Sequence, residues 1–206
     1  MRFALRPWML VALTLLVYLA AIYAGRDVGA EAFVTPGSCY EQCTGRRSCE
    51  VPPGTPRAQY IEIEGYDGQF AYYIARAPLE AAPCLDAPAY RYQRILLPAL
   101  GGLLALGDPV RLPWALVLVN SVALVGATAL LEGMFQQVGR QRWFALGYGL
   151  FFGLVVGIRL STPEPLAYGL VVLALWAQMR GQPAGAVGAL LLAAFCQRNT
   201  LLFSAG

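Results

Sequence analysis

The sequence predicts an all-α polytopic membrane protein with about five transmembrane helices, an interfacial or re-entrant helix and a large first external loop. Three observations predict this class: 58% of the 206 residues are hydrophobic, only 13% are charged, and the apolar residues gather in long runs. Such a composition excludes a soluble globular protein. The formal net charge is only +3, so nucleic acid is not expected among the partners.

Residues 1–24 are interpreted as an N-terminal membrane anchor helix. Residues 7–24 carry no charge and would form a helix of roughly 27 Å, which is long enough to span a bilayer. A signal peptide is the alternative, but the apolar run is long for one, and no convincing small-x-small cleavage site precedes Gly25. Arg2 and Arg6 precede the run, so the positive-inside rule places the N-terminus in the cytoplasm.

Residues 25–111 are expected to form an external loop with interfacial helices. Polar residues, glycine and proline are frequent up to about Tyr92. An exported loop with several cysteines favours two disulfides, whose pairing the sequence leaves open, among Cys39, Cys43, Cys49 and Cys84. A zinc site is less favoured because the chain has no histidine to complete it. Cys196, in a later apolar run, is interpreted as a small buried hydrophobic side chain.

Residues 112–206 are predicted to form a transmembrane helical bundle, and the end of the chain inside or just after its last apolar run suggests a truncated protein. Four runs are expected to cross the membrane, at residues 112–135, 143–158, 164–179 and 184–203. The run at 95–107 is short and contains Pro98, so we place it at the interface or as a re-entrant segment. This choice puts all the flanking arginines on the cytoplasmic side, namely Arg2, Arg6, Arg140, Arg142 and Arg180. A crossing at 95–107 would instead move Arg140, Arg142 and Arg180 to the outside.

Two acidic residues are the strongest candidates for chemistry. The absence of histidine excludes Ser-His-Asp triads and imidazole metal ligands. Asp67 follows a tyrosine and precedes a glycine at a turn that opens a short helix, where a carboxylate could cap the helix, act as a general base or bind a divalent cation. Glu164 lies between Pro163 and Pro165, where it is either a helix N-terminal acid or the partner of Asp67 in catalysis and metal binding.

Three arginines and a tyrosine are candidate substrate-binding residues. Arg91 and Arg94 are three residues apart on one helix face, so they could bind a phosphate or extend to lipid headgroups. Arg198 interrupts the last apolar run, where it either binds a phosphate or marks the outer end of the span. Tyr72 could line an acceptor cleft or be one of the aromatic residues common at interfaces.

Two motifs carry a resemblance to a known group of proteins. The stretch Tyr66-Asp67-Gly68-Gln69-Phe70, taken with the run from Tyr90 to Pro98, resembles bacterial membrane proteins associated with cell-surface glycopolymer formation. More distantly, the layout resembles GT-C-type glycosyltransferases, including the aminoarabinose and GPI mannosyl transferases. The resemblance covers residues 60–206 and lacks the Asp-Asp pair of several GT-C enzymes, which also generally have more than five crossings.

The resemblance implies a function and a role for each candidate. It implies an integral protein of the bacterial inner membrane that moves a sugar from a polyprenyl-phosphate donor to a cell-envelope glycan or lipid acceptor. Asp67 would be the essential acid of the first external loop, Glu164 the second acid, and Arg198 a phosphate ligand. The alternatives are a non-catalytic assembly or transport component of glycopolymer export, and an inactive fragment.

Overall fold

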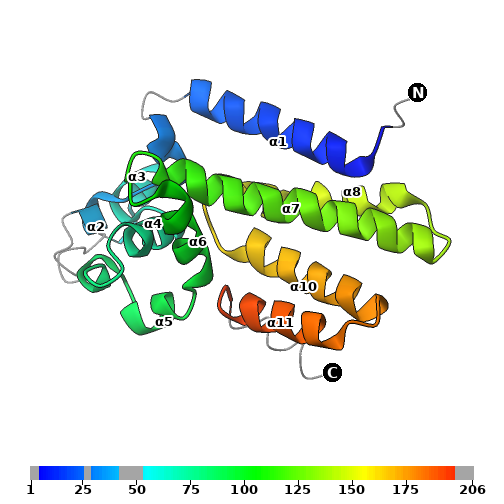
Figure 1. Ribbon diagram of the computed structural model, residues 1–206. Coiled ribbons are helices and arrows are strands. Elements are labelled where there is room, and N and C mark those ends of the chain that lie inside the picture. The colour runs from blue at the N-terminus through cyan, green and yellow to red at the C-terminus, as the bar shows by residue number, and fades with distance from the viewer. Residues whose placement is uncertain (1–4, 26–28, 42–52, 198–206) are drawn as a thin grey trace.

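The computed structural model describes residues 5–25, 29–41 and 53–197, and these residues form helices and turns with no β-strand. The predicted all-α class is therefore confirmed for the described part of the chain. Figure 1 shows a layer of long helices that run side by side, with the shorter helices of residues 29–105 gathered at one end of the layer.

Four helices form the layer seen in Figure 1. Helix α1 (Pro7–Ala24) packs on α7 (Leu112–Gln137), which also packs on α10 (Glu164–Met179), and α10 packs on α11 (Pro183–Ala194). Proline at the first or second position of each of these helices fits the geometry of a helix start. The predicted runs 7–24 and 164–179 coincide with the observed helices.

The run at 143–158 was predicted as one crossing, but it forms a broken helix. The turn η4 (Arg142–Phe144) and α8 (Ala145–Gly149) are followed by α9 (Phe152–Arg159), with a bend of 49° between the two halves. The backbone is extended at Phe151, with ψ of 119°, and four glycines in this run weaken a continuous helix.

Two of the described helices, α1 and α7, are long and apolar enough to cross a membrane, and the bent pair would make a third span. Helices α10, α11 and α6 (Leu96–Ala105) are apolar but shorter. These features are consistent with a membrane protein, whereas the count of five crossings stays a prediction.

Specific contacts define the two ends of the bundle. At the arginine end, Arg6 and Arg142 each lie 4.0 Å from the buried carboxylate of Glu132, which joins the start of α1 to the end of α7. At the loop end, the rings of Tyr23 and Trp114 lie 5.1 Å apart, so the end of α1 meets the start of α7. The chain therefore leaves and re-enters the long-helix layer at the same end.

Helix α6 also begins at the loop end. The backbone N–H of Leu96 donates a hydrogen bond of 3.2 Å to the carbonyl of Phe195, just after α11. With 10 residues, α6 would reach only about 15 Å. The placement of residues 95–107 at the interface or as a re-entrant segment stays a prediction.

The loop between α1 and α7 has a small core of its own. Its elements are η1 (Gly29–Phe33), α2 (Ser38–Glu41), α3 (Arg57–Glu64), α4 (Gly68–Arg76), η3 (Ala82–Cys84) and α5 (Pro88–Tyr92). Buried Tyr40, Phe70, Ile74 and Leu85 pack together here, and Tyr40 meets Phe70 edge to face at 5.1 Å. This core fixes the position of α4 at the end of the bundle.

Cys84 is buried in this core and Cys39 packs against it, and neither is a free thiol. Cys43 and Cys49 lie outside the described residues, so the predicted disulfides stay a prediction. Cys196 is free and fully buried against α6, α7 and α10, as expected for a small hydrophobic side chain.

Candidate functional site

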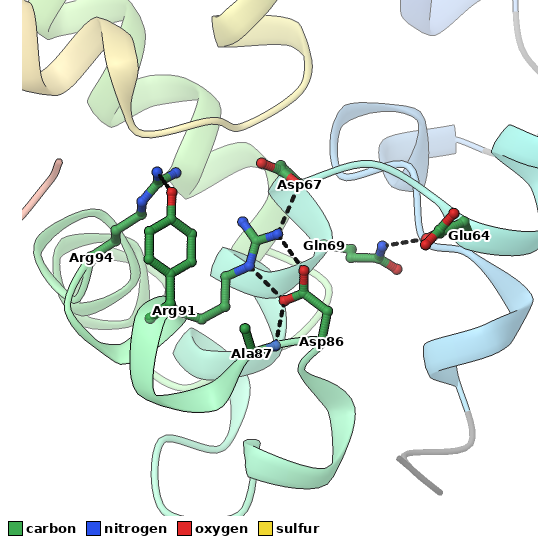
Figure 2. Close-up of polar contacts among 8 residues, drawn as sticks. Glu64, Asp67, Gln69, Asp86, Ala87, Arg91 and Arg94 are labelled. Carbon is green, nitrogen blue, oxygen red and sulfur yellow. Dashed lines mark hydrogen bonds and ion pairs between the residues drawn. The ribbon is translucent and has the colours of Figure 1, made fainter. Parts of the chain in front are cut away.

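Asp67 lies at the turn before α4, as the sequence predicts, but it does not cap the helix. The helix begins at Gly68, and the carboxylate of Asp67 makes no hydrogen bond to the helix N-terminus. The capping interpretation is therefore wrong. Figure 2 shows the carboxylate paired instead with Arg91, whose Nη2 donates a hydrogen bond of 2.9 Å to Oδ1 of Asp67.

Arg91 is a buried cation held by two carboxylates. Its Nε and Nη2 donate hydrogen bonds of 2.7 and 2.8 Å to the two oxygens of Asp86, a bidentate pair, while Nη2 also reaches Asp67. The guanidinium lies 4.1 Å from the centre of the Phe70 ring. Burial alone would lower the pKa of Arg91, but the hydrogen bonds and charges of Asp86 and Asp67 raise it above its ordinary value. Arg91 therefore stays cationic and orients Asp67.

Gln69 holds the segment before α4 in place. Its buried side chain accepts a hydrogen bond of 2.9 Å from the backbone N–H of Gly37 and donates one of 2.7 Å to the carbonyl of Glu64. Gly65 has a φ of 72°, a backbone conformation that favours glycine. The segment from Gly65 to Gln69 is thus held on both sides, and Asp67 has a fixed place on it.

Gly68 brings Asp67 against the turn that precedes α10. A Cβ at position 68 would lie 1.7 Å from the carbonyl oxygen of Leu160, so only glycine allows this approach. The turn itself is held by α7, because Nδ2 of buried Asn120 donates a hydrogen bond of 2.9 Å to the carbonyl of Thr162. The first-loop motif and the 160–164 segment therefore meet at the loop end of the bundle.

Asp67 lines two hollows of different character. One is an inner pocket of about 20 Å³, which Asp67 lines with Arg91, Arg94 and Pro163. The buried Nε of Arg94 has no hydrogen-bond partner among the described residues. The inner pocket holds a water molecule or so, which is too little for a sugar without movement of its walls.

The second hollow is an outer cavity of about 400 Å³ between α3, the turn before α4 and the segment before α5. Its walls include aromatic and charged side chains, from Tyr40, Arg57, Tyr60, Glu64, Tyr66, Asp67 and Asp86. Asp67 thus stands in the wall that the outer cavity shares with the inner pocket.

Glu164 is the first residue of α10, so its predicted place at a helix N-terminus is confirmed. It follows Pro163, which lines the inner pocket, but it does not line that pocket itself. The structure therefore brings Asp67 next to the residue before Glu164, at one end of the bundle.

The remaining predicted site residues fall in different places. Arg91 and Arg94 both line the inner pocket, although Arg91 belongs to α5 and Arg94 follows its end. Tyr72 lines a separate cavity with Glu62 and Arg76, away from the hollows of Asp67. Arg198 lies outside the described residues.

Sequence reasoning missed Asp86, Tyr60 and Asn120. The spacing of Asp86, five residues before Arg91, could have pointed to a helix-start partner for the arginine. Asn120 gave a weaker signal, as a polar side chain in an apolar run. Tyr60 gave none, because only the turn at Gly65 brings α3 beside Asp67.

A metal centre receives no support from clustering, because the described residues contain no group of three or more histidine, cysteine or acidic side chains that could hold an ion. Metal binding by Asp67 and Glu164 stays a prediction. Comparisons with protein-family models, curated proteins and solved structures gave no match.

Proposed function

We propose that the chain is an integral membrane glycosyltransferase-like protein, which moves a sugar from a polyprenyl-phosphate donor to a cell-envelope glycan or lipid acceptor. The observation that carries the proposal is the position of Asp67. It lies at the end of a bundle with membrane-length helices, between a pocket that contains Arg94 and an open polar cavity. A general base must lie within hydrogen-bond reach of the acceptor hydroxyl, and a place between the two hollows would also bring that hydroxyl beside the donor.

The proposed step is a direct displacement at the anomeric carbon. The acceptor hydroxyl oxygen forms the new bond to that carbon and passes its proton to Asp67, while the polyprenyl phosphate leaves with the bonding pair. Among the described residues only Oδ1 of Asp67 is hydrogen bonded, so Oδ2 can receive the proton. Arg94 neutralises the charge of the phosphate that leaves. Glu164, at the start of α10, is the second acid and the partner of Asp67 in this step.

A lipid-linked donor is supported by an apolar groove whose lining begins three residues after residues of the inner pocket, on α6 and on the segment that enters α10. The groove has a volume of about 480 Å³ and lies between α6, α7 and α10. Leu97 and Pro163 line the inner pocket, while Leu100 and Leu166, three residues further along the same segments, line the groove. A phosphate at Arg94 would therefore have its hydrocarbon chain in the groove.

The proposed topology has five crossings, with the N-terminus in the cytoplasm of a bacterium and residues 25–111 outside. It is supported by the shared arginine end, where Arg6 and Arg142 meet, and by the placement of α6 at the loop end. Single cysteines at positions 108, 139 and 181 test it with a membrane-impermeant thiol reagent. We expect labelling from outside at 108 only, whereas labelling at 139 or 181 would contradict the topology.

The transfer itself is tested with the purified full chain in liposomes and a polyprenyl-phosphate donor carrying a radiolabelled sugar. Asp67→Asn should abolish transfer to a glycan acceptor without reducing the amount of protein in the membrane. Asp108→Asn is the matched control, because Asp108 pairs only locally with Arg111 at 3.0 Å and lines neither hollow. Equal transfer by Asp67→Asn and the wild type would remove Asp67 from the mechanism.

A non-catalytic assembly component is the second candidate, and two observations favour it. The ion pair of Asp67 with Arg91 and the small inner pocket would also suit a purely structural role. Photo-crosslinking with a polyprenyl-phosphate sugar separates the two candidates. A transferase should be labelled near Arg94, whereas an assembly component should not be labelled.

A further inference from the structure

We infer that the outer cavity binds a neutral or amino-sugar unit of the acceptor and rejects anionic sugars. This inference rests on the proposed function and names the acceptor class that this function would use. It is carried by three properties of the cavity: its volume, its aromatic rings and its charge.

The size and the rings of the cavity suit a carbohydrate. A volume of about 400 Å³ lies within the range of small-molecule sites, about 300–1,000 Å³. Tyr60 and Tyr66 line it and remain 43% and 44% exposed, so each ring offers a surface to a ligand. The C–H faces of a sugar pack on such rings, while its hydroxyls donate hydrogen bonds to nearby carboxylates.

The charge of the cavity walls determines which ligand charge the outer cavity accepts. Three carboxylates line the cavity, on Glu64, Asp67 and Asp86, against the single guanidinium of Arg57. Arg91 offsets part of this charge from behind Asp67 and Asp86, yet it is itself buried. An anionic sugar would meet like charges in the cavity, whereas a neutral or protonated amino sugar would not.

The inner pocket has the opposite preference. Its charged lining is Asp67 with Arg91 and Arg94, and the buried Nε of Arg94 is a donor without a partner in the described part of the chain. Asp67 therefore separates a basic pocket, whose charge suits a phosphate but whose walls must move to admit one, from an acidic cavity suited to a hydroxyl-rich ligand. This difference keeps the two substrates from exchanging places.

Saturation-transfer NMR on the full chain in detergent tests the inference with three soluble probes: methyl α-mannopyranoside, glucosamine and glucuronate. We expect saturation of the first two and at least about fivefold less for glucuronate. Tyr66→Ala should weaken the bound signal by about five- to tenfold, the effect of one lost aromatic contact. Tyr168→Ala is the matched control and should leave the signal unchanged, because Tyr168 is exposed on α10 and lines neither hollow of Asp67.

A charge variant checks the selectivity separately. Glu64→Gln removes one carboxylate from the wall and keeps the Glu64 backbone carbonyl that accepts from Gln69, so the local fold is retained. It should raise glucuronate binding. Saturation of glucuronate equal to that of methyl mannoside in the wild type would overturn the inference, as would a signal equally strong in Tyr66→Ala.

The same preparation distinguishes this inference from the proposed function. Selective sugar binding without any transfer would leave the cavity assignment in place and remove the transferase proposal. Transfer without selective binding in the outer cavity would leave the transferase proposal in place and remove the cavity assignment.

Discussion

Replacement of Gly68 by alanine is the sharpest test of how the site is assembled. The new Cβ would lie 1.7 Å from the carbonyl oxygen of Leu160, where ordinary contact begins at 3.4 Å, so the two backbones must part by about 1.7 Å. Overpacking of this kind costs about 1–3 kcal/mol. For a chain of this size that lowers the Tm by about 2–12 °C.

The same shift moves Asp67 away from the turn before α10. A displacement of about 1 Å at a reacting group can cost about 100-fold in rate, so we expect transfer to fall by at least about tenfold. The Tm is measured by thermal unfolding in detergent, and transfer by the radiolabelled-donor assay.

Gly133→Ala is the matched control for this substitution. Gly133 lies inside α7 and a Cβ there meets nothing within 4 Å. Alanine is preferred over glycine in a helix by about 1 kcal/mol, so the Tm should stay level or rise. If Gly68→Ala unfolds at the same temperature as Gly133→Ala and transfers sugar at the wild-type rate, the close packing of Asp67 on the turn is refuted.

Four further predictions concern the contacts around the site and the ion pairs at the arginine end of the bundle. Gln69→Leu leaves the buried N–H of Gly37 and the partly buried carbonyl of Glu64 without their partner. It should lower the free energy of unfolding by about 2 kcal/mol or more, measured by thermal unfolding, with an unchanged Tm as the contrary result. Arg91→Lys loses the bidentate pair with Asp86 and should lower the Tm by about 2–6 °C. The carboxylates raise the pKa of Arg91 despite its burial. In the wild type, the contribution of the Arg91 ion pairs to the free energy of unfolding is therefore fully present at any pH below the pKa of Arg91 in the unfolded chain. Titration of Arg91 should therefore not change stability between about pH 6 and about pH 9 in a pH series of melts. Glu132→Gln removes the buried charge that Arg6 and Arg142 share. Both arginines lie 4.0 Å away and Arg6 is largely exposed, so stability should fall by less than about 1 kcal/mol while amide exchange at the start of α1 accelerates. Slower exchange there would show that the pair does not hold α1.

The long helices could be predicted closely because their signal is local. Apolar runs without charge form helices wherever they are buried in lipid or protein, so the ends of α1 and α10 follow directly from composition and proline positions. The break at Phe151 was missed because a bend between two apolar halves leaves the hydrophobic pattern unchanged. The position of Asp67 before a short helix was also local, and it was predicted correctly.

The partners of Asp67 could not be predicted from the sequence. A carboxylate before a glycine at a helix start favours capping, and only the packing of α5 on α4 brings Arg91 within 2.9 Å to take that carboxylate instead. Tyr72 illustrates the converse: its place in the same helix as the motif suggested a shared cleft, but the helix turns it to another face.

By itself, the sequence determined an all-helical, strongly apolar chain with membrane-length segments and a polar loop that carries its acidic motif. Those properties depend on the solubility and backbone preferences of neighbouring residues, which the order of amino acids records directly. The tertiary structure alone decided that Gly68 lies against Leu160, that Arg91 holds two carboxylates and that Asp67 divides an acidic cavity from a basic pocket. These contacts join residues up to 92 positions apart, from 68 to 160, and their energies exist only after the helices have packed.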